Sequence, residues 1–106
     1  MADVARISDM EKLLDESRSA LDQLMEALEA FAAVQENIRT LDLYYTGEEW
    51  REDFEADEQG LLPPDLKRGV LSEDAVWDLL TDNRELLARL LEVAAESIRE
   101  GLKESV

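Results

Sequence analysis

One uninterrupted stretch decides the fold: residues 7–38 read ISDMEKLLDESRSALDQLMEALEAFAAVQENI. It contains no proline or glycine, and apolar residues recur in it at alternating spacings of three and four. The repeating positions are Ile7, Met10, Leu14, Ser17, Leu21, Leu24, Leu28, Phe31, Gln35 and Ile38. This period is typical of an amphipathic helix, so we predict one long helix over residues 4–44.

A second apolar column widens this seam to the face of a bundle helix. Its members are Leu13, Ala20, Ala27, Val34 and Leu41. The first helix is predicted to be about 60 Å long, against about 45 Å of helix from Ser72 onward, at ~1.5 Å per residue. We therefore predict a homodimer in which uncovered ends, residues 4–20, pair antiparallel. The alternative is a monomer whose N-terminal turns fray or fold back over the third helix.

The segment after the long helix carries signals for a helix start and a helix stop. Thr46, with Glu49 three residues later, has the spacing of a capping box, which predicts a short acidic helix over residues 46–59. Gly60 is suited to the C-terminal end of that helix. A Pro-Pro turn follows, so we predict a loop over residues 60–71.

A third helix is predicted over residues 72–103. Ser72 is a favourable N-cap residue, and apolar residues recur after it at helical spacing. Asp82 and Glu85 form a second capping pattern inside this segment. The sequence therefore leaves two alternatives open, a continuous helix or a break near residues 81–83.

The composition excludes several classes of function. The 106 residues include 27 acidic and 11 basic side chains, for a net charge of -16, so phosphates are repelled and neither nucleic acid nor an anionic membrane is an expected partner. The absence of cysteine and histidine excludes disulfides, thiol nucleophiles and the usual general base. With no signal-peptide pattern and no apolar run of membrane-spanning length, we expect a cytoplasmic protein.

The middle of the chain holds the candidate site. On a helical wheel, two aromatic residues of the short helix are neighbours and two aspartates lie on their side. Two tyrosines precede this helix, and the only adjacent pair of basic residues follows it. We predict hydrogen bonds or salt bridges among these groups, which form either a structural clasp or an interaction surface. The candidate residues are Tyr44, Tyr45, Trp50, Asp53, Phe54, Asp57, Lys67 and Arg68.

Two carboxylate patterns suggest metal chemistry. Glu49, Asp53 and Asp57, spaced four apart, are an alternative source of oxygen ligands for Mg²⁺ or Ca²⁺. Glu26 and Glu29 have the E-x-x-E spacing of helical pyrophosphohydrolases, but they lie opposite the apolar seam. We therefore predict no enzyme, with no catalytic, cofactor-binding or metal-binding residue. The alternatives are a Mg²⁺-dependent carboxylate enzyme acting on a phosphorylated small molecule, or an acidic nucleic-acid mimic.

Two stretches, WREDFEADE at residues 50–58 and LKRGVLSED at residues 66–74, carry the most specific part of a wider pattern. Through this pattern nearly the whole chain, and most specifically residues 44–82, resembles an uncharacterised bacterial family, which is catalogued only as a domain of unknown function (number 4298). The individual matching residues are Tyr44, Trp50, Asp53, Asp57, Gly60, Pro63, Lys67, Arg68, Gly69, Leu71, Ser72, Glu73 and Asp74. The resemblance implies a bacterial source and a helical fold, and it brings no activity.

Together these patterns predict an all-α protein forming a single domain over residues 1–106. Its two long helices are expected to pack as an antiparallel hairpin or bundle, joined by the short acidic helix and the Pro-Pro loop. The predicted function is a small non-catalytic cytoplasmic module that binds another protein or regulates it.

Overall fold

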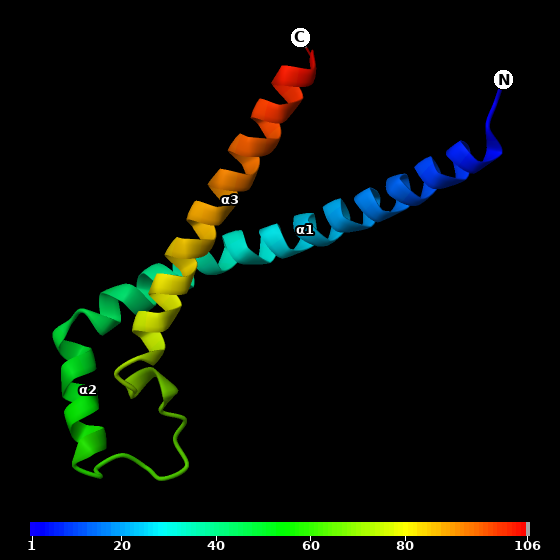
Figure 1. Ribbon diagram of the computed structural model, residues 1–106. Helices are drawn as coiled ribbons and strands as arrows, with labels where there is room; N and C mark the ends of the chain where they lie inside the picture. Colours follow the sequence, from blue (N-terminus) through cyan, green and yellow to red (C-terminus); the bar gives the residue numbers. More distant parts are fainter. Residues whose placement is uncertain (106) are drawn as a thin grey trace. The chain divides into compact units, whose positions relative to one another are not determined.

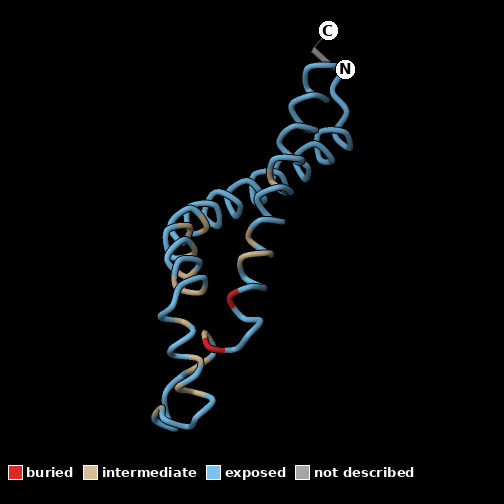
Figure 2. The backbone as a smooth tube through the Cα atoms, turned by 90° about the vertical axis from the view of Figure 1, so that its left-hand side faces the viewer, coloured by how far each residue is buried: buried red, intermediate tan, exposed pale blue. Residues whose placement is uncertain are grey.

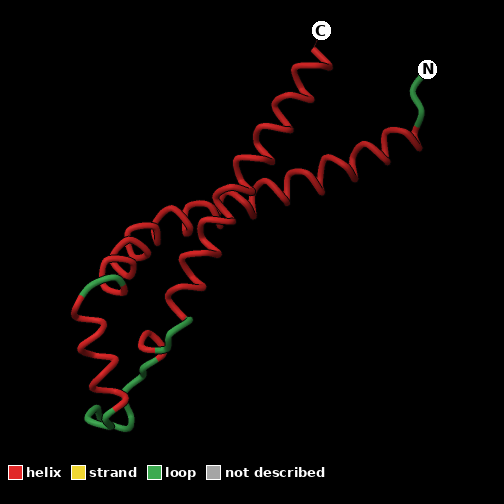
Figure 3. The backbone as a smooth tube through the Cα atoms, turned by 60° about the vertical axis from the view of Figure 1, so that its left-hand side comes forward, coloured by secondary structure: helices red, strands yellow, loops and turns green. Residues whose placement is uncertain are grey.

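The computed structural model of the chain describes residues 1–105. Its elements are, in chain order, α1 (Val4–Tyr45), α2 (Glu48–Glu58), the 3₁₀ helix η1 (Gly69–Leu71) and α3 (Ala75–Ser105) (Figure 1). No strand occurs within residues 1–105 (Figure 3). The all-α prediction is confirmed for the described residues. Val106, which ends the predicted domain, lies outside the described residues.

The chain divides into two compact units, Met1–Asn37 and Ile38–Val106. In the first unit every residue of α1 is exposed except Phe31 and Gln35, which are half-buried. The second unit holds the last turns of α1, then α2, η1 and α3. Its two buried residues within the described chain are Leu71 and Val76, at 6% and 3% exposure (Figure 2). The core of the second unit therefore lies where η1 leads into α3.

Local signals account for the start and the length of α1. The side chain of Asp3 accepts a hydrogen bond from the backbone N–H of Arg6 at 3.1 Å, so Asp3 acts as the N-cap residue. Alanine, leucine, glutamate and glutamine, all good helix formers, fill much of the following sequence. The helix ends at Tyr45, one residue beyond the predicted end. None of the helices in residues 1–105 combines the length and apolar content needed to cross a membrane.

The predicted capping box at Thr46 is wrong. Helix α2 begins at Glu48, its N-cap residue is Gly47, and no side chain caps it. The Thr46 hydroxyl instead donates to the backbone carbonyl of Asp42 at 2.8 Å. Threonine hydroxyls can bond to the carbonyl four residues earlier, and this choice competes with capping. Here Thr46 completes the last turn of α1, and the short acidic helix spans residues 48–58 instead of 46–59.

The predicted stop at Gly60 is confirmed. Gly60 has a φ of 71°, in the left-handed region that glycine adopts without strain. Its N–H donates to the carbonyl of Asp57 at 3.0 Å, and the N–H of Leu61 donates to that of Ala56 at 3.0 Å. These two bonds define a Schellman motif, which satisfies carbonyls left open at the helix end.

The loop after Gly60 contains the predicted turn and a short helical element. The N–H of Leu66 donates to the carbonyl of Pro63 at 3.1 Å, which closes the turn at the two prolines. The remainder of the predicted loop is not all irregular, because residues 69–71 form η1.

Helix α3 is continuous, so the alternative of a break near residues 81–83 is wrong. Aspartate and asparagine in a helix interior cost less than about 1 kcal/mol each, and no proline or glycine interrupts the helix there. The Ser72 hydroxyl accepts the N–H of Ala75 at 3.1 Å, as a capping side chain does. The helix itself runs from Ala75 to Ser105, compared with the predicted residues 72–103.

Candidate functional site

The predicted site residues all lie in the second unit, on elements adjacent along the chain. The last turn of α1 supplies the two tyrosines, α2 supplies two aromatics and two aspartates, and the segment before η1 supplies the basic pair. Every member except one contacts another member of this group. The exception is Lys67, which is exposed and has no ion-pair partner within the described part of the chain.

Three aromatic rings stack at the junction of α1 and α2. The rings of Tyr45 and Trp50 meet edge to face, with centroids 5.1 Å apart and an interplanar angle of 68°. Trp50 and Phe54 are stacked at 5.0 Å and 17°. Both geometries are favourable for aromatic pairs and add about 0.5–1.5 kcal/mol to the burial of their area. The stack therefore holds the end of α1 against α2.

Polar atoms of the same rings reach the segment that leads into α3. The Trp50 indole N–H donates to the carbonyl of Val70 at 2.9 Å. The Tyr45 hydroxyl donates to the carbonyl of Glu73 at 3.0 Å. Sequence reasoning missed both acceptors, because they are backbone groups whose direction depends on the loop. The aromatic stack thus also fixes the approach to α3.

Tyr44 and Asp53 form one of the polar contacts among which the sequence left the choice open. The Tyr44 hydroxyl donates to Oδ2 of Asp53 at 2.5 Å. Burial, the hydrogen bond to Asp53 and the negative charges of Asp53 and Glu49 together raise the pKa of Tyr44 to about 12. Because its hydroxyl stays protonated at neutral pH, Tyr44 acts there as a hydrogen-bond donor to Asp53.

Arg68 and Asp57 form another of these contacts, which is a salt bridge. Nη1 of Arg68 lies 2.5 Å from Oδ1 of Asp57, and the two side chains are 37% and 27% exposed. Both charges are therefore partly removed from water, where a charge-assisted hydrogen bond is stronger than at a fully solvated site. The bridge ties the last turn of α2 to the residue that precedes η1.

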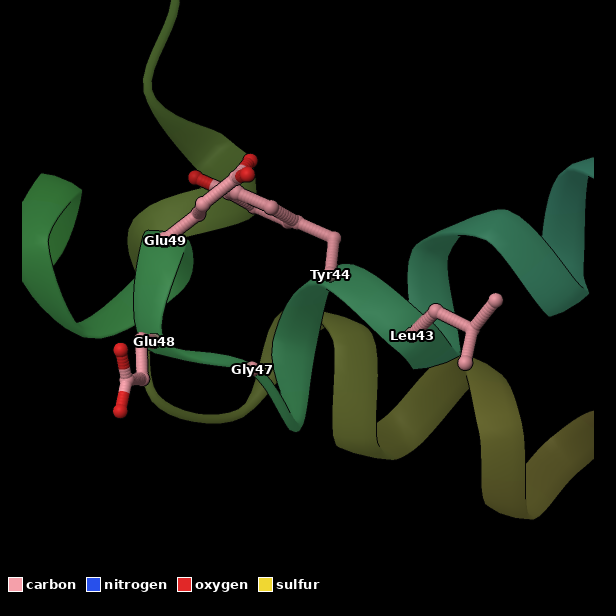
Figure 4. Close-up of a pocket in the computed structure, with 5 residues that line it drawn as sticks. All are labelled: Leu43, Tyr44, Gly47, Glu48 and Glu49. Atoms are coloured by element: carbon pink, nitrogen blue, oxygen red, sulfur yellow. The ribbon is translucent and has the colours of Figure 1, made fainter.

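An open depression lies beside this cluster, at the α1–α2 junction. It is lined by Leu43, Tyr44, Gly47, Glu48 and Glu49 (Figure 4). The Glu49 side chain extends to the same side as Tyr44, whereas Glu48 points the other way (Figure 4).

The structure does not assemble the cation site suggested by Glu49, Asp53 and Asp57. Asp53 accepts the hydroxyl of Tyr44, and Asp57 is paired with Arg68. No group of three or more acidic side chains suited to hold a metal ion occurs among the described residues. Two of the three carboxylates in this pattern are therefore engaged in contacts within the chain.

A second candidate surface lies in the first unit. It consists of large apolar residues that are 47–58% exposed although they repeat at heptad spacing. We call this surface the α1 seam, and its members are Ile7, Met10, Leu14, Leu21, Leu24 and Leu28. Exposed single apolar residues are common, whereas these six recur along one side of α1, with Ser17 at the one polar position among them.

The sequence was compared with models of known protein families. The family described as Domain of unknown function (DUF4298) matches residues 7–93. The chain belongs to the DUF4298 family. The match covers both candidate surfaces, the α1 seam and the cluster around Trp50. No curated protein and no solved structure matches this DUF4298 chain.

Proposed function

We propose that this DUF4298 protein is a small non-catalytic, cytoplasmic protein-interaction module that binds a partner helix through the α1 seam. One observation carries the proposal. Six large apolar side chains form a heptad row on α1 that is interrupted only at Ser17, and each is about half exposed. Such a row is the recognition element of helix-to-helix binding, in which apolar residues at a and d positions insert between those of the partner.

Hydrophobic burial is strong enough to drive this binding. Fully burying a leucine, isoleucine or methionine side chain contributes about 1.5–3 kcal/mol, so covering the exposed half of six such residues contributes several kcal/mol. Association consumes part of this gain through lost translational freedom and side-chain ordering. The acidic surface, with its net charge of -16, favours partners that are neutral or basic around their apolar residues.

The cluster around Trp50 supports this assignment by its contacts. Its aromatic rings, tyrosine hydroxyls and Arg68 bond to groups within the same unit. Such contacts favour a structural clasp that holds α2 and η1 together. We therefore assign recognition to the α1 seam and stability of the second unit to the clasp.

Affinity capture with matched variants tests the binding role. The baits are the wild-type protein, Leu24→Glu on the α1 seam and Gln23→Glu, which adds the same charge one residue away on the opposite side of the helix. We expect protein from a lysate of cells that naturally make this chain to be retained by the wild type and by Gln23→Glu and to be lost from Leu24→Glu. Equal retention on all three baits would contradict the proposal, provided that circular dichroism shows equal helix content.

Calorimetry tests the proposal that the protein is not a metal-dependent enzyme. Titration with Mg²⁺, Mn²⁺ and Ca²⁺ is expected to give no binding at micromolar concentration, because Asp53 and Asp57 are already engaged. Micromolar binding that disappears in Asp53→Asn would instead support a metal-dependent enzyme.

A further inference from the structure

We infer that the partner of the α1 seam is a second copy of this chain, paired antiparallel so that Leu21 of one copy lies opposite Leu24 of the other. The inference rests on the proposed function, because it names the occupant of the same surface. In this register the two-fold axis passes between residues 22 and 23, and a two-fold dimer is the commonest oligomer geometry. Leu14 then lies opposite Phe31 of the second copy.

The apolar column beside the seam favours the antiparallel direction. It includes Leu13, Ala20, Ala27 and Val34, each one residue before a seam position. An antiparallel pair places this column against itself, with Leu13 opposite Val34 and Ala20 opposite Ala27. All four residues are exposed in the single chain. Antiparallel pairing therefore covers the seam and the column together.

A parallel, in-register pair brings different side chains together on the same flank. In such a pair, a column residue of one copy lies beside the residue five positions further along the second copy. That residue directly follows a seam position. Leu13 would meet Arg18, and Val34 would meet Arg39. The parallel pair would thus separate the column residues from one another, whereas the antiparallel pair packs the whole column together on one flank and brings Arg18 beside Met25 on the other flank.

The net charge of the second unit favours the same direction. Residues 38–106 contain 18 acidic and eight basic side chains, a net charge of -10. A parallel pair brings two such units to the same end of the paired helices. An antiparallel pair separates their starting points along the helix axis by about 45 Å, at ~1.5 Å per residue. Since the Debye length is about 8–10 Å at ordinary ionic strength, the repulsion is then largely screened.

The polar seam residues do not reverse this preference. In-register parallel helices would pair Gln35 with Gln35 and Ser17 with Ser17, whereas antiparallel helices place them opposite Met10 and Leu28. The Gln35 amide, however, already donates to the carbonyl of Phe31 at 3.3 Å. This bond lets Gln35 face an apolar residue at reduced cost, because its N–H group has an acceptor in its own helix.

The available surface is sufficient for a stable dimer. The seam and column residues of one α1, half-exposed as they are, offer on the order of 800 Å² per chain, which is the contribution of one partner to a standard interface. A helix with an apolar row of the same length covers such a surface from end to end. The α1 helix of a second copy meets that requirement.

Disulfide trapping tests the direction and the register. The chain has no cysteine, so only introduced thiols react. Leu14→Cys and Phe31→Cys proteins are reduced, mixed and then oxidised, alone and together. A disulfide requires Cα atoms within about 7 Å. We expect a cross-linked dimer as the main product in the mixture and not with either variant alone. Cross-linking of each variant with itself would show parallel pairing and overturn the inference.

A second pair and an outward pair serve as controls. Ser17→Cys with Leu28→Cys occupies another seam level and is expected to cross-link in the mixture, which protects the test against a disruptive effect of Phe31→Cys. Asp15→Cys with Glu29→Cys lies at a similar level on the outer side of the helix and is expected to stay uncross-linked. If the outward pair cross-links as much as the seam pairs, the disulfides form by random collision. That result would overturn the inference.

Sedimentation equilibrium separates this inference from the proposed function. Wild-type protein at moderate salt is expected to have a mass of two chains across the micromolar range, and Leu24→Glu is expected to have a mass of one chain. A wild-type monomer that still captures proteins through the α1 seam would overturn the second copy as partner and leave the proposed function standing. A wild-type monomer that captures nothing would contradict both.

Discussion

Nη1 of Arg68 lies 2.5 Å from Oδ1 of Asp57, so a salt bridge joins the end of α2 to the segment before η1. The pair links residues eleven positions apart, across a loop that contains two prolines. It therefore restrains the loop that leads to the buried residues Leu71 and Val76. The salt bridge lies outside the core of the second unit and stabilises that core by restraining the loop.

Replacing Arg68 with alanine should destabilise the second unit by about 1–2 kcal/mol, because a half-buried, charge-assisted bond is lost and Asp57 remains partly buried. The expected decrease in melting temperature is several degrees, measured by circular dichroism. Arg51→Ala is the control, since Arg51 is exposed and has no ion pair within the described residues. Equal small decreases for both variants would show that the bridge contributes nothing.

The Tyr44 hydroxyl should make the free energy of unfolding decrease at high pH. Its pKa is raised to about 12 from an ordinary value of 10.0, so the folded state favours the protonated hydroxyl. This contribution is fully present below about pH 10 and is lost as the pH rises toward 12. Urea unfolding across this range should show a steeper loss for the wild type than for Tyr44→Phe. Parallel curves would mean that the bond to Asp53 is not maintained in solution.

Trp50 should matter more to stability than Trp77. Replacing Trp50 with phenylalanine removes the hydrogen bond to Val70 and part of the aromatic stack, and should cost about 1–3 kcal/mol. Trp77 is 57% exposed, so Trp77→Phe should cost less than about 1 kcal/mol. Denaturant unfolding of the two variants measures the difference. A larger effect at Trp77 would be incompatible with the observed packing.

Two glycines should respond to alanine in opposite directions. Gly60 has a positive φ, so Gly60→Ala should destabilise by about 1 kcal/mol. Gly101 lies inside α3 with nothing near the position of an added Cβ, so Gly101→Ala should be neutral or should stabilise by up to about 1 kcal/mol. Thermal unfolding checks both. A stabilising Gly60→Ala would argue against the Schellman motif.

The sequence predicted those features that depend on local signals. The long apolar period and the absence of breakers defined α1 to within one residue, and a glycine before two prolines marked the end of α2. That an aspartate of α2 contacts the basic pair or a tyrosine followed from opposite charge and helix geometry, without the individual partners. In these cases, short-range interactions between residues close in the sequence favour the observed structure.

Other features depend on choices that the sequence leaves open. Thr46 can cap the following helix or bond to the preceding turn, and the structure takes the second choice. The acceptors of Tyr45 and Trp50 are carbonyls of Glu73 and Val70, whose directions are set by the loop as a whole. Arg68 rather than Lys67 forms the salt bridge for the same reason.

The central claim, that the α1 seam binds protein, is tested most directly inside cells. A photo-reactive phenylalanine analogue placed at position 24 lies on the seam, and the same analogue at position 23 lies on the opposite side. After irradiation, we expect a covalent protein adduct from position 24 and little from position 23, with a mass of two chains if the partner is a second copy. No adduct from position 24, or equal adducts from both positions, would contradict the claim.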